Sequence, residues 1–177
     1  MPSTSERLQQ AIRQQLGESA VLRIIQENPS LVDMQEKFNG QTIMEHATDH
    51  WSWHCLEEIA KLTQADPEDN AGFGYALLAA IRFNKFSVIL LLLEKGAKTT
   101  HKDRDHNNCL HLAILRTPES PELINIILKH DTNACYLTQT NTAGYTPLIL
   151  AIQTQKLHIA RMIVNHYLVA GAKLPLF

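Results

Sequence analysis

Apolar residues recur every three or four positions along most of the chain, the spacing that places side chains on one face of an α-helix. A first helix is predicted between Ser5, whose hydroxyl can cap its start, and Gly17, which ends it. A second helix ends at Asn28-Pro29, because the residue before a proline disfavours the α conformation. The uninterrupted apolar run 88–93 predicts a fully buried helix, since a membrane span needs roughly 20 residues. Further helices are predicted where apolar side chains cluster, at 55–62, 123–128 and 159–164.

A short motif returns four times at a near-constant interval. Its fullest copy, at 144–151, reads G-Y-T-P-L-I-L-A. The alanine that ends each copy lies at position 47, 80, 113 or 151, so the copies are separated by 33, 33 and 38 residues. The longer last interval comes from extra residues in the turn 117–121 and in the loop 131–141. Such a period indicates stacked helix pairs, each of which buries its apolar face against its neighbours.

With this motif and this period, the chain resembles the ankyrin-repeat family over nearly its whole length. The resemblance implies an all-α fold, an ankyrin-repeat solenoid of helix-turn-helix units with protruding finger loops, in a single domain over residues 1–177. We expect an N-terminal capping helix pair and about four motif-bearing repeats. The expected boundaries are 5–33 for the capping pair, 37–69 for repeat 1, 70–102 for repeat 2, 103–140 for repeat 3, and 141–177 for repeat 4 with the C-terminal cap. The fingers and inner helices of such a solenoid form a concave binding face.

Individual positions match the family pattern or depart from it. Thr42 is expected to cap the first inner helix with its hydroxyl, and Gly96 to take the left-handed conformation that ends an outer helix. His111 stands where the family has a histidine with a structural hydrogen bond, whereas His106 replaces the usual glycine of a finger. The last helix is expected to be about one turn longer, because extra residues precede Gly171-Ala172.

The resemblance also implies where a partner would bind, since the family's variable, exposed residues lie on the fingers and on the solvent side of the inner helices. Phe83, Arg104 and Tyr145 rank first, because aromatic residues and arginine are enriched at binding hot spots. Trp51 and Trp53 lie at the turn of repeat 1, where contact with a partner and packing over the repeat edge are both open. The alternative for every position is an ordinary solvated surface. The full candidate set is Asn39, Gln41, Asp49, His50, Trp51, Arg82, Phe83, Arg104, Asp105, Asn107, Arg116, Thr142, Tyr145 and Gln153.

Clusters of histidine and cysteine offer a competing interpretation as metal sites. His46, His50 and His54 are spaced by four, which on one continuous helix would create a metal-binding face. The repeat pattern breaks that helix near Trp51, which moves His54 away. A second cluster at 101–111 contains the motif histidine, whose family role is structural. We therefore expect no metal and no cofactor.

Composition and charge argue against several other classes of function. The net charge of −2 and the dispersed Lys and Arg residues give no electrostatic drive towards nucleic acid or an anionic membrane. Cys55, Cys109 and Cys135 are widely spaced and odd in number, which favours a reducing compartment over a disulfide framework. The N-terminus lacks a secretory apolar segment, and the chain contains neither a P-loop nor a G-x-S-x-G motif. We expect a non-enzymatic, cytoplasmic and monomeric protein.

The sequence thus predicts a protein-protein interaction module that holds a protein partner on its concave face. Three alternatives remain open at this point. The chain could be a structural or regulatory domain of a larger complex, docked through the apolar tail 174–177. It also resembles the small, divergent ankyrin proteins that intracellular bacteria inject into host cells, which would make it an effector acting on a host protein. A metal-dependent enzyme using a His/Cys cluster is the third.

Overall fold

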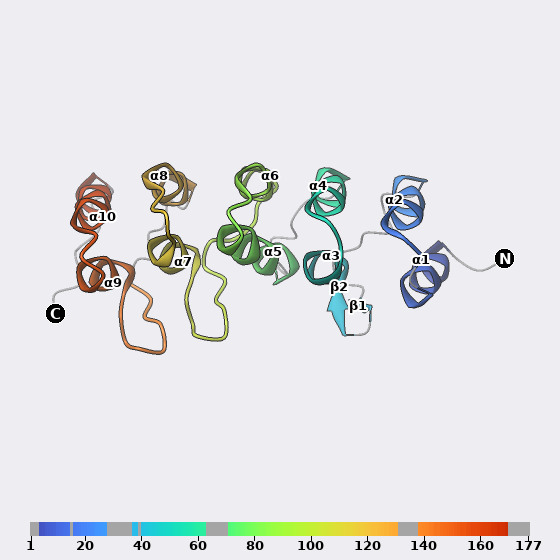
Figure 1. Cartoon of the computed structure of the whole chain (residues 1–177), viewed down its shortest axis with the longest axis horizontal. Coiled ribbons are helices and arrows are strands. Elements are labelled where there is room, and N and C mark those ends of the chain that lie inside the picture. Colours follow the sequence, from blue (N-terminus) through green and yellow to red (C-terminus); the bar gives the residue numbers. More distant parts are fainter. Residues whose placement is uncertain are drawn as a thin grey trace. The chain divides into compact units, whose positions relative to one another are not determined.

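The computed structural model describes residues 4–14, 16–27, 37–38, 40–62, 71–130 and 138–169. Within these ranges the chain forms ten α-helices and one very short β-hairpin, so the predicted all-α fold is confirmed (Figure 1). The elements are α1 (Thr4–Arg13), α2 (Glu18–Glu27), β1 (Lys37–Phe38), β2 (Gln41–Thr42), α3 (Ile43–His50), α4 (Trp53–Leu62), α5 (Ala71–Arg82), α6 (Phe86–Glu94), α7 (Cys109–Leu115), α8 (Pro121–His130), α9 (Pro147–Gln153) and α10 (Leu157–Val169). Since α1 already includes Ser5, that residue is part of the helix and not its cap.

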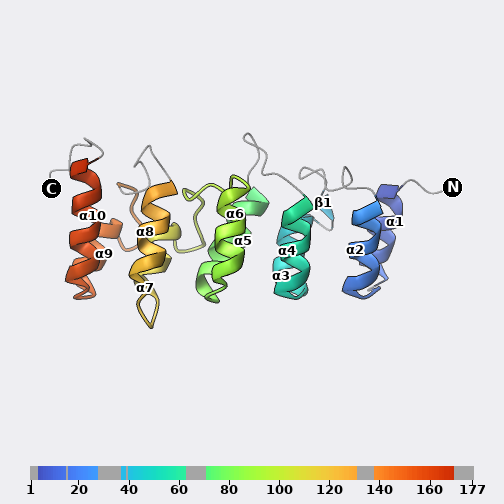
Figure 2. The same cartoon turned by 90° about the horizontal axis from the view of Figure 1, so that it is seen from above.

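The chain divides into two units, and α5 contributes its last two residues to the second. The first unit holds Met1–Ala80 and Lys85–Lys98, and the second holds Ile81–Asn84 and Thr99–Phe177. In the first, α1 packs on α2 and α3 on α4, while α4 lies between α2 and α6 (Figure 2). In the second, α7 packs on α8 and α9 on α10, and the two pairs join through α7 with α9 and α8 with α10. Each unit is therefore built from helix pairs stacked side by side, as the repeat pattern predicts.

The core of each unit consists of the apolar face of every helix. Met44 and Ala47 of α3 are 0% exposed, and Ala113 and Ala151 are similarly buried where α7 meets α9. One expectation is wrong: α6 is not fully buried, because Leu90 is 37% exposed. Leu91 of the same run is half-buried. An unbroken apolar run therefore does not mean that every side chain of the helix is buried.

Polar side chains start the inner helices in the same way in different repeats. Thr42 Oγ1 accepts a hydrogen bond from the Glu45 N–H at 3.2 Å, and Glu45 Oε2 accepts from the Thr42 N–H at 2.8 Å, which completes a capping box. Thr146 Oγ1 accepts from the Ile149 N–H at 3.3 Å at the start of α9. Asn108, which replaces the family's threonine, caps α7 with its side-chain oxygen. The expected cap at Thr42 is confirmed.

The ends of the outer helices also follow the expectations from sequence. Gly96 follows α6 with a φ of 92°, in the left-handed region that favours glycine, so its predicted role is confirmed. Helix α10 has 13 residues against 10 in α8, which confirms the predicted extra turn. That turn brings Tyr167, which is 1% exposed, into the core of the second unit. The predicted Gly171-Ala172 end and the tail 174–177 lie outside the described residues.

Candidate protein-binding surfaces

Two fingers of the second unit share one turn geometry. In the finger before α7, Asp103 Oδ1 accepts hydrogen bonds from the backbone N–H groups of Asp105 at 2.9 Å and Asn107 at 2.8 Å. In the finger before α9, Asn141 Oδ1 accepts from the N–H groups of residues 143 and 145, both at 3.1 Å. The two turns are 38 residues apart, the same interval as the alanines of their repeats. Both fingers are therefore held in a fixed conformation by a side chain at their base.

Hydrogen bonds also tie the two fingers to each other, and they lie side by side beyond α7 and α9 (Figure 1). The Thr142 N–H donates to Asp105 O at 2.9 Å, and Asn141 Nδ2 donates to Asn107 Oδ1 at 3.1 Å. Asn107 is only 6% exposed, so the expectation that it presents its side chain to a partner is wrong. Its amide oxygen accepts the hydrogen bond from Asn141, which places the side chain between the two fingers.

His111 links α7 to the neighbouring finger, as the motif histidine was expected to do. Nε2 lies 2.9 Å from Tyr145 O, and a carbonyl can only accept, so Nε2 carries the proton. Nδ1 lies 2.8 Å from Asn108 Oδ1 and 3.3 Å from the Asn108 nitrogen. The imidazole is fully buried, and this burial lowers the pKa of His111 despite the opposing effect of the hydrogen bond to Tyr145. His111 thus has a structural role, because it joins α7 to the finger before α9.

What the fingers leave in solvent is a small set of polar and aromatic side chains. Arg104, Asp105 and Thr142 are exposed at the turns, and Tyr145 is 37% exposed. Gln153, also exposed, ends α9. The backbone groups of Asp105, Thr142 and Tyr145 take part in the finger hydrogen bonds. The second unit therefore presents a rigid, mixed polar and aromatic surface, which is the composition of many protein-binding sites.

Three other predicted residues lie where α5 and α7 end. Arg82, Phe83 and Arg116 line one surface pocket of about 540 Å³, which lies entirely within the second unit. Arg82 Nη2 is 2.5 Å from Asp103 Oδ2, so its charge is offset, whereas Phe83 is 66% exposed. Burial would raise the pKa of Asp103, but hydrogen bonds from Asn107 and Arg82 outweigh it and lower that pKa.

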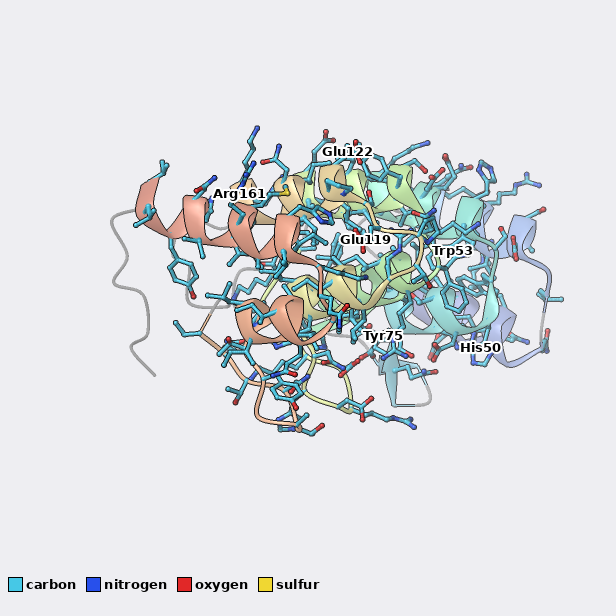
Figure 3. All side chains as sticks on the ribbon, turned by 60° about the vertical axis from the view of Figure 1, so that its left-hand side comes forward. His50, Trp53, Tyr75, Glu119, Glu122 and Arg161 are labelled. Atoms are coloured by element: carbon cyan, nitrogen blue, oxygen red, sulfur yellow. The ribbon has the colours of Figure 1, made fainter. Side chains whose placement is uncertain are left out.

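In the first unit, the predicted residues are tied together around one carboxylate. Asp49 accepts hydrogen bonds from Gln41 Nε2 at 2.8 Å and from the Tyr75 hydroxyl at 2.7 Å. Figure 3 shows Tyr75 and His50 on the side of this unit where the β-hairpin lies. Trp51 packs edge-on against the His46 ring, at 5.1 Å between centroids. Asn39 lies outside the described residues.

A family comparison decides what these stacked pairs are. The sequence matches the family model for ankyrin repeats, in three copies, over residues 77–174, more than half of the chain. The chain belongs to the ankyrin-repeat family. Ankyrin repeats generally bind proteins and are typically non-enzymatic. A comparison with curated proteins gives no match.

The helix boundaries separate histidines that the sequence places in one cluster. Helix α3 ends at His50 and α4 begins at Trp53, so His54 is on a different helix from His46 and His50. No group of three metal-capable side chains is found in the part of the chain that the structure describes. Cys55 and Cys109 are buried, and burial raises both pKa values, that of Cys55 to about 12. Both side chains are therefore thiols at neutral pH, without thiolate nucleophilicity.

The two tryptophans of repeat 1 divide their surface between core and solvent. Both are half-buried, and Lys85 Nζ lies 5.7 Å from the centroid of the Trp53 ring, within cation–π distance. Each tryptophan thus covers the repeat edge and still offers an exposed face.

Among the described helices, none is long and apolar enough to cross a membrane.

Sequence reasoning missed several residues that shape these surfaces. Tyr75 is not among the predicted residues, yet its hydroxyl donates to Asp49 at 2.7 Å. Leu115 is 47% exposed at the pocket, although it ends an apolar helix. Lys156 donates to the carbonyls that end α7, from 40 residues or more along the chain. The period of 33 to 38 residues was the available signal, since residues one period apart face each other in neighbouring repeats.

Proposed function

We propose that this ankyrin-repeat protein is a non-enzymatic interaction module that binds a protein partner through its fingers and inner helices. The observation that carries the proposal is the division of polar groups in the two fingers of the second unit. Asp103, Asn107 and Asn141 are used to fix the turns, while Arg104 and Tyr145 are left exposed on them. A preorganised backbone lowers the entropic cost of binding, so a few exposed side chains can supply affinity.

The site map predicts which positions lie within reach of the partner. A photo-crosslinking amino acid is introduced at Asp105, at Thr142 or, as a control, at Arg161. Arg161 is exposed on α10, and Figure 3 shows it on the side away from the fingers. Irradiation in a lysate should give the same adduct from both finger positions and none from Arg161. Equal adducts from all three positions would contradict the proposed surface.

A double variant then tests whether the finger side chains contribute affinity. Arg104→Ala with Tyr145→Ala should abolish the adduct formed from Thr142. Because Tyr145 is 37% exposed, the unfolding midpoint of this variant is measured as well, to show that it remains folded. The matched control combines Glu122→Ala and Arg161→Ala on the outer helices (Figure 3). An adduct that survives the finger variant but not the control would move the interface to the outer helices.

A second function, as a regulatory domain within a larger complex, is favoured by the surface of α10. Leu157 is 66% exposed, Leu168 65% and Val169 89%, which is unusual for three large apolar side chains on one helix. Replacing Leu168 and Val169 with Ser should then release the chain from its complex in size-exclusion chromatography of the native lysate. A partner in the cytoplasm of the producing cell fits either function, and a host-cell lysate tests the effector alternative with the same crosslinking variants.

A further inference from the structure

The pocket at the helix ends of the second unit has an apolar rim and a cationic wall. Phe83 follows α5, Leu115 ends α7, and Pro118 lies in the turn after α7. Phe83 and Leu115 are 66% and 47% exposed, although burial of such side chains is favourable by about 1.5–3 kcal/mol each. None of the lining residues belongs to the finger turns 103–107 or 141–145, although Arg82 of the pocket pairs with Asp103 at the base of one finger.

Arg116 supplies a donor that the fold does not satisfy. Its Nη1 atom is buried and finds no hydrogen-bond acceptor in the described part of the structure. The nearby carboxylates are already engaged. Asp103 pairs with Arg82 at 2.5 Å, and Glu119 lies 3.0 Å from His158 and 3.9 Å from Lys156. The half-buried Arg116 side chain lines the pocket, and among the described residues no carboxylate forms an ion pair with it. A carboxylate on a bound segment would therefore compensate its charge.

We infer that this pocket binds a short segment of the partner protein in which an acidic side chain stands next to an apolar one. The carboxylate would accept from the Arg116 guanidinium, and the apolar side chain would cover Phe83 and Leu115. This inference rests on the proposed protein-binding function and adds a second contact, with defined chemistry, to the finger surface.

Charge and shape favour a carboxylate over a phosphate. Arg82 is neutralised by Asp103, and the Lys156 ammonium is directed to the carbonyls of Ile114 and Arg116. One guanidinium therefore remains, which matches the single charge of a carboxylate and leaves a phosphate dianion half compensated. The exposed Phe83 beside it requires an apolar neighbour in the same ligand.

A random dodecapeptide phage library panned against the full chain tests the inference without knowledge of the partner. The selected peptides should carry Asp or Glu adjacent to an apolar residue. The most enriched peptide, synthesised with a fluorophore, is then titrated against four proteins: wild type, Arg116→Leu, Arg104→Ala with Tyr145→Ala, and Arg161→Leu as a matched surface control. Affinity should fall at least tenfold for Arg116→Leu and stay within twofold for the other variants.

Amide chemical shifts locate the peptide even if Arg116→Leu proves unstable. In the wild-type protein, addition of the peptide should shift the amide signals of residues 82–84 and 112–117 and leave those of the finger 141–145 unchanged. The inference is overturned if no peptide is enriched, or if the enriched peptides lack acidic residues. It is also overturned if Arg116→Leu binds the peptide as tightly as the wild type does. A peptide in which phosphoserine replaces the acidic residue, and which binds more tightly, would overturn it as well. If the crosslinking at Asp105 and Thr142 succeeds while these tests fail, the finger surface stands and the pocket alone is refuted.

Discussion

Lys156, which precedes α10, donates hydrogen bonds to backbone carbonyls at the end of α7. Its replacement is expected to destabilise the second unit. Nζ donates to Ile114 O at 2.5 Å and to Arg116 O at 2.9 Å, and its side chain is only 11% exposed. The last carbonyls of a helix have no partner within that helix. These two hydrogen bonds therefore satisfy groups that would otherwise be half-buried and unpaired.

The Lys156→Met variant keeps the apolar stem and removes both hydrogen bonds. A hydrogen bond that involves a charged group contributes about 1.5–3 kcal/mol net, so two of them set the upper range of the loss. Methionine also removes the desolvation cost of a nearly buried ammonium, which offsets part of this loss. We expect a net decrease of about 2 kcal/mol in the free energy of unfolding, or roughly 4–8 °C in Tm at about 2–4 °C per kcal/mol for this size.

Urea unfolding measures the loss, with Lys129→Met as the matched control. Lys129 is exposed on α8, so its replacement should cost less than about 0.5 kcal/mol. Native-state hydrogen exchange should show the Lys156→Met effect first in the amides of α7 and α9, because the lost bonds join these helix pairs. Equal unfolding midpoints for the two variants would refute the reasoning, since water would then satisfy the carbonyls as well as lysine does.

Three further predictions concern single positions. A Cβ at Gly72 would lie 2.5 Å from Thr42 Oγ1, the cap of α3, so Gly72→Ala should lower Tm although alanine improves helix propensity by about 1 kcal/mol; an unchanged or higher Tm would contradict the close approach. His106 has a φ of 58°, so His106→Gly should raise the free energy of unfolding in urea titration by about 0.5 kcal/mol, and a decrease would show that the imidazole has a stabilising contact. Because burial lowers the pKa of His111, the unfolded chain takes up the proton first, and stability should fall as pH decreases below about 6.5. His111→Gln should flatten this dependence between pH 7.5 and 5.5, with a remainder from His46, whose pKa is also lowered by burial. An unchanged slope would contradict the lowered pKa of His111.

The fold was predictable because every repeat carries the same signals independently. Where one signal is lost, a chemically equivalent one replaces it. Asn108 stands in place of the family's threonine, yet its side-chain oxygen accepts from the N–H groups of Leu110 and His111 and caps α7 in the same manner. His106 stands in place of glycine and still adopts the left-handed conformation, since the finger hydrogen bonds on both sides impose it. The backbone conformation of the repeat is thus retained at positions where the residue that usually specifies it is replaced.

The candidate surfaces were less predictable, because exposure depends on bonds between repeats. Asn107 looked like a finger residue with a free amide, but Asn141, 34 residues later, holds it in the interior. Arg82 looked like a free hot-spot arginine, but Asp103 offsets its charge. The partner of Asn107 lies 34 residues away and that of Arg82 lies 21 residues away. The sequence of a single repeat does not reveal whether its neighbour supplies such a partner.

This dependence suggests where specificity lies in the molecule. A polar side chain whose hydrogen bonds are completed by the next repeat is fixed by folding and contributes little new energy to binding. Arg116 and Arg82 line the same pocket, but among the described residues only Arg82 has a carboxylate at its guanidinium. The partner can therefore gain most from groups that the stack leaves unsatisfied, and in the second unit these are the finger side chains of Arg104 and Tyr145 and the guanidinium of Arg116.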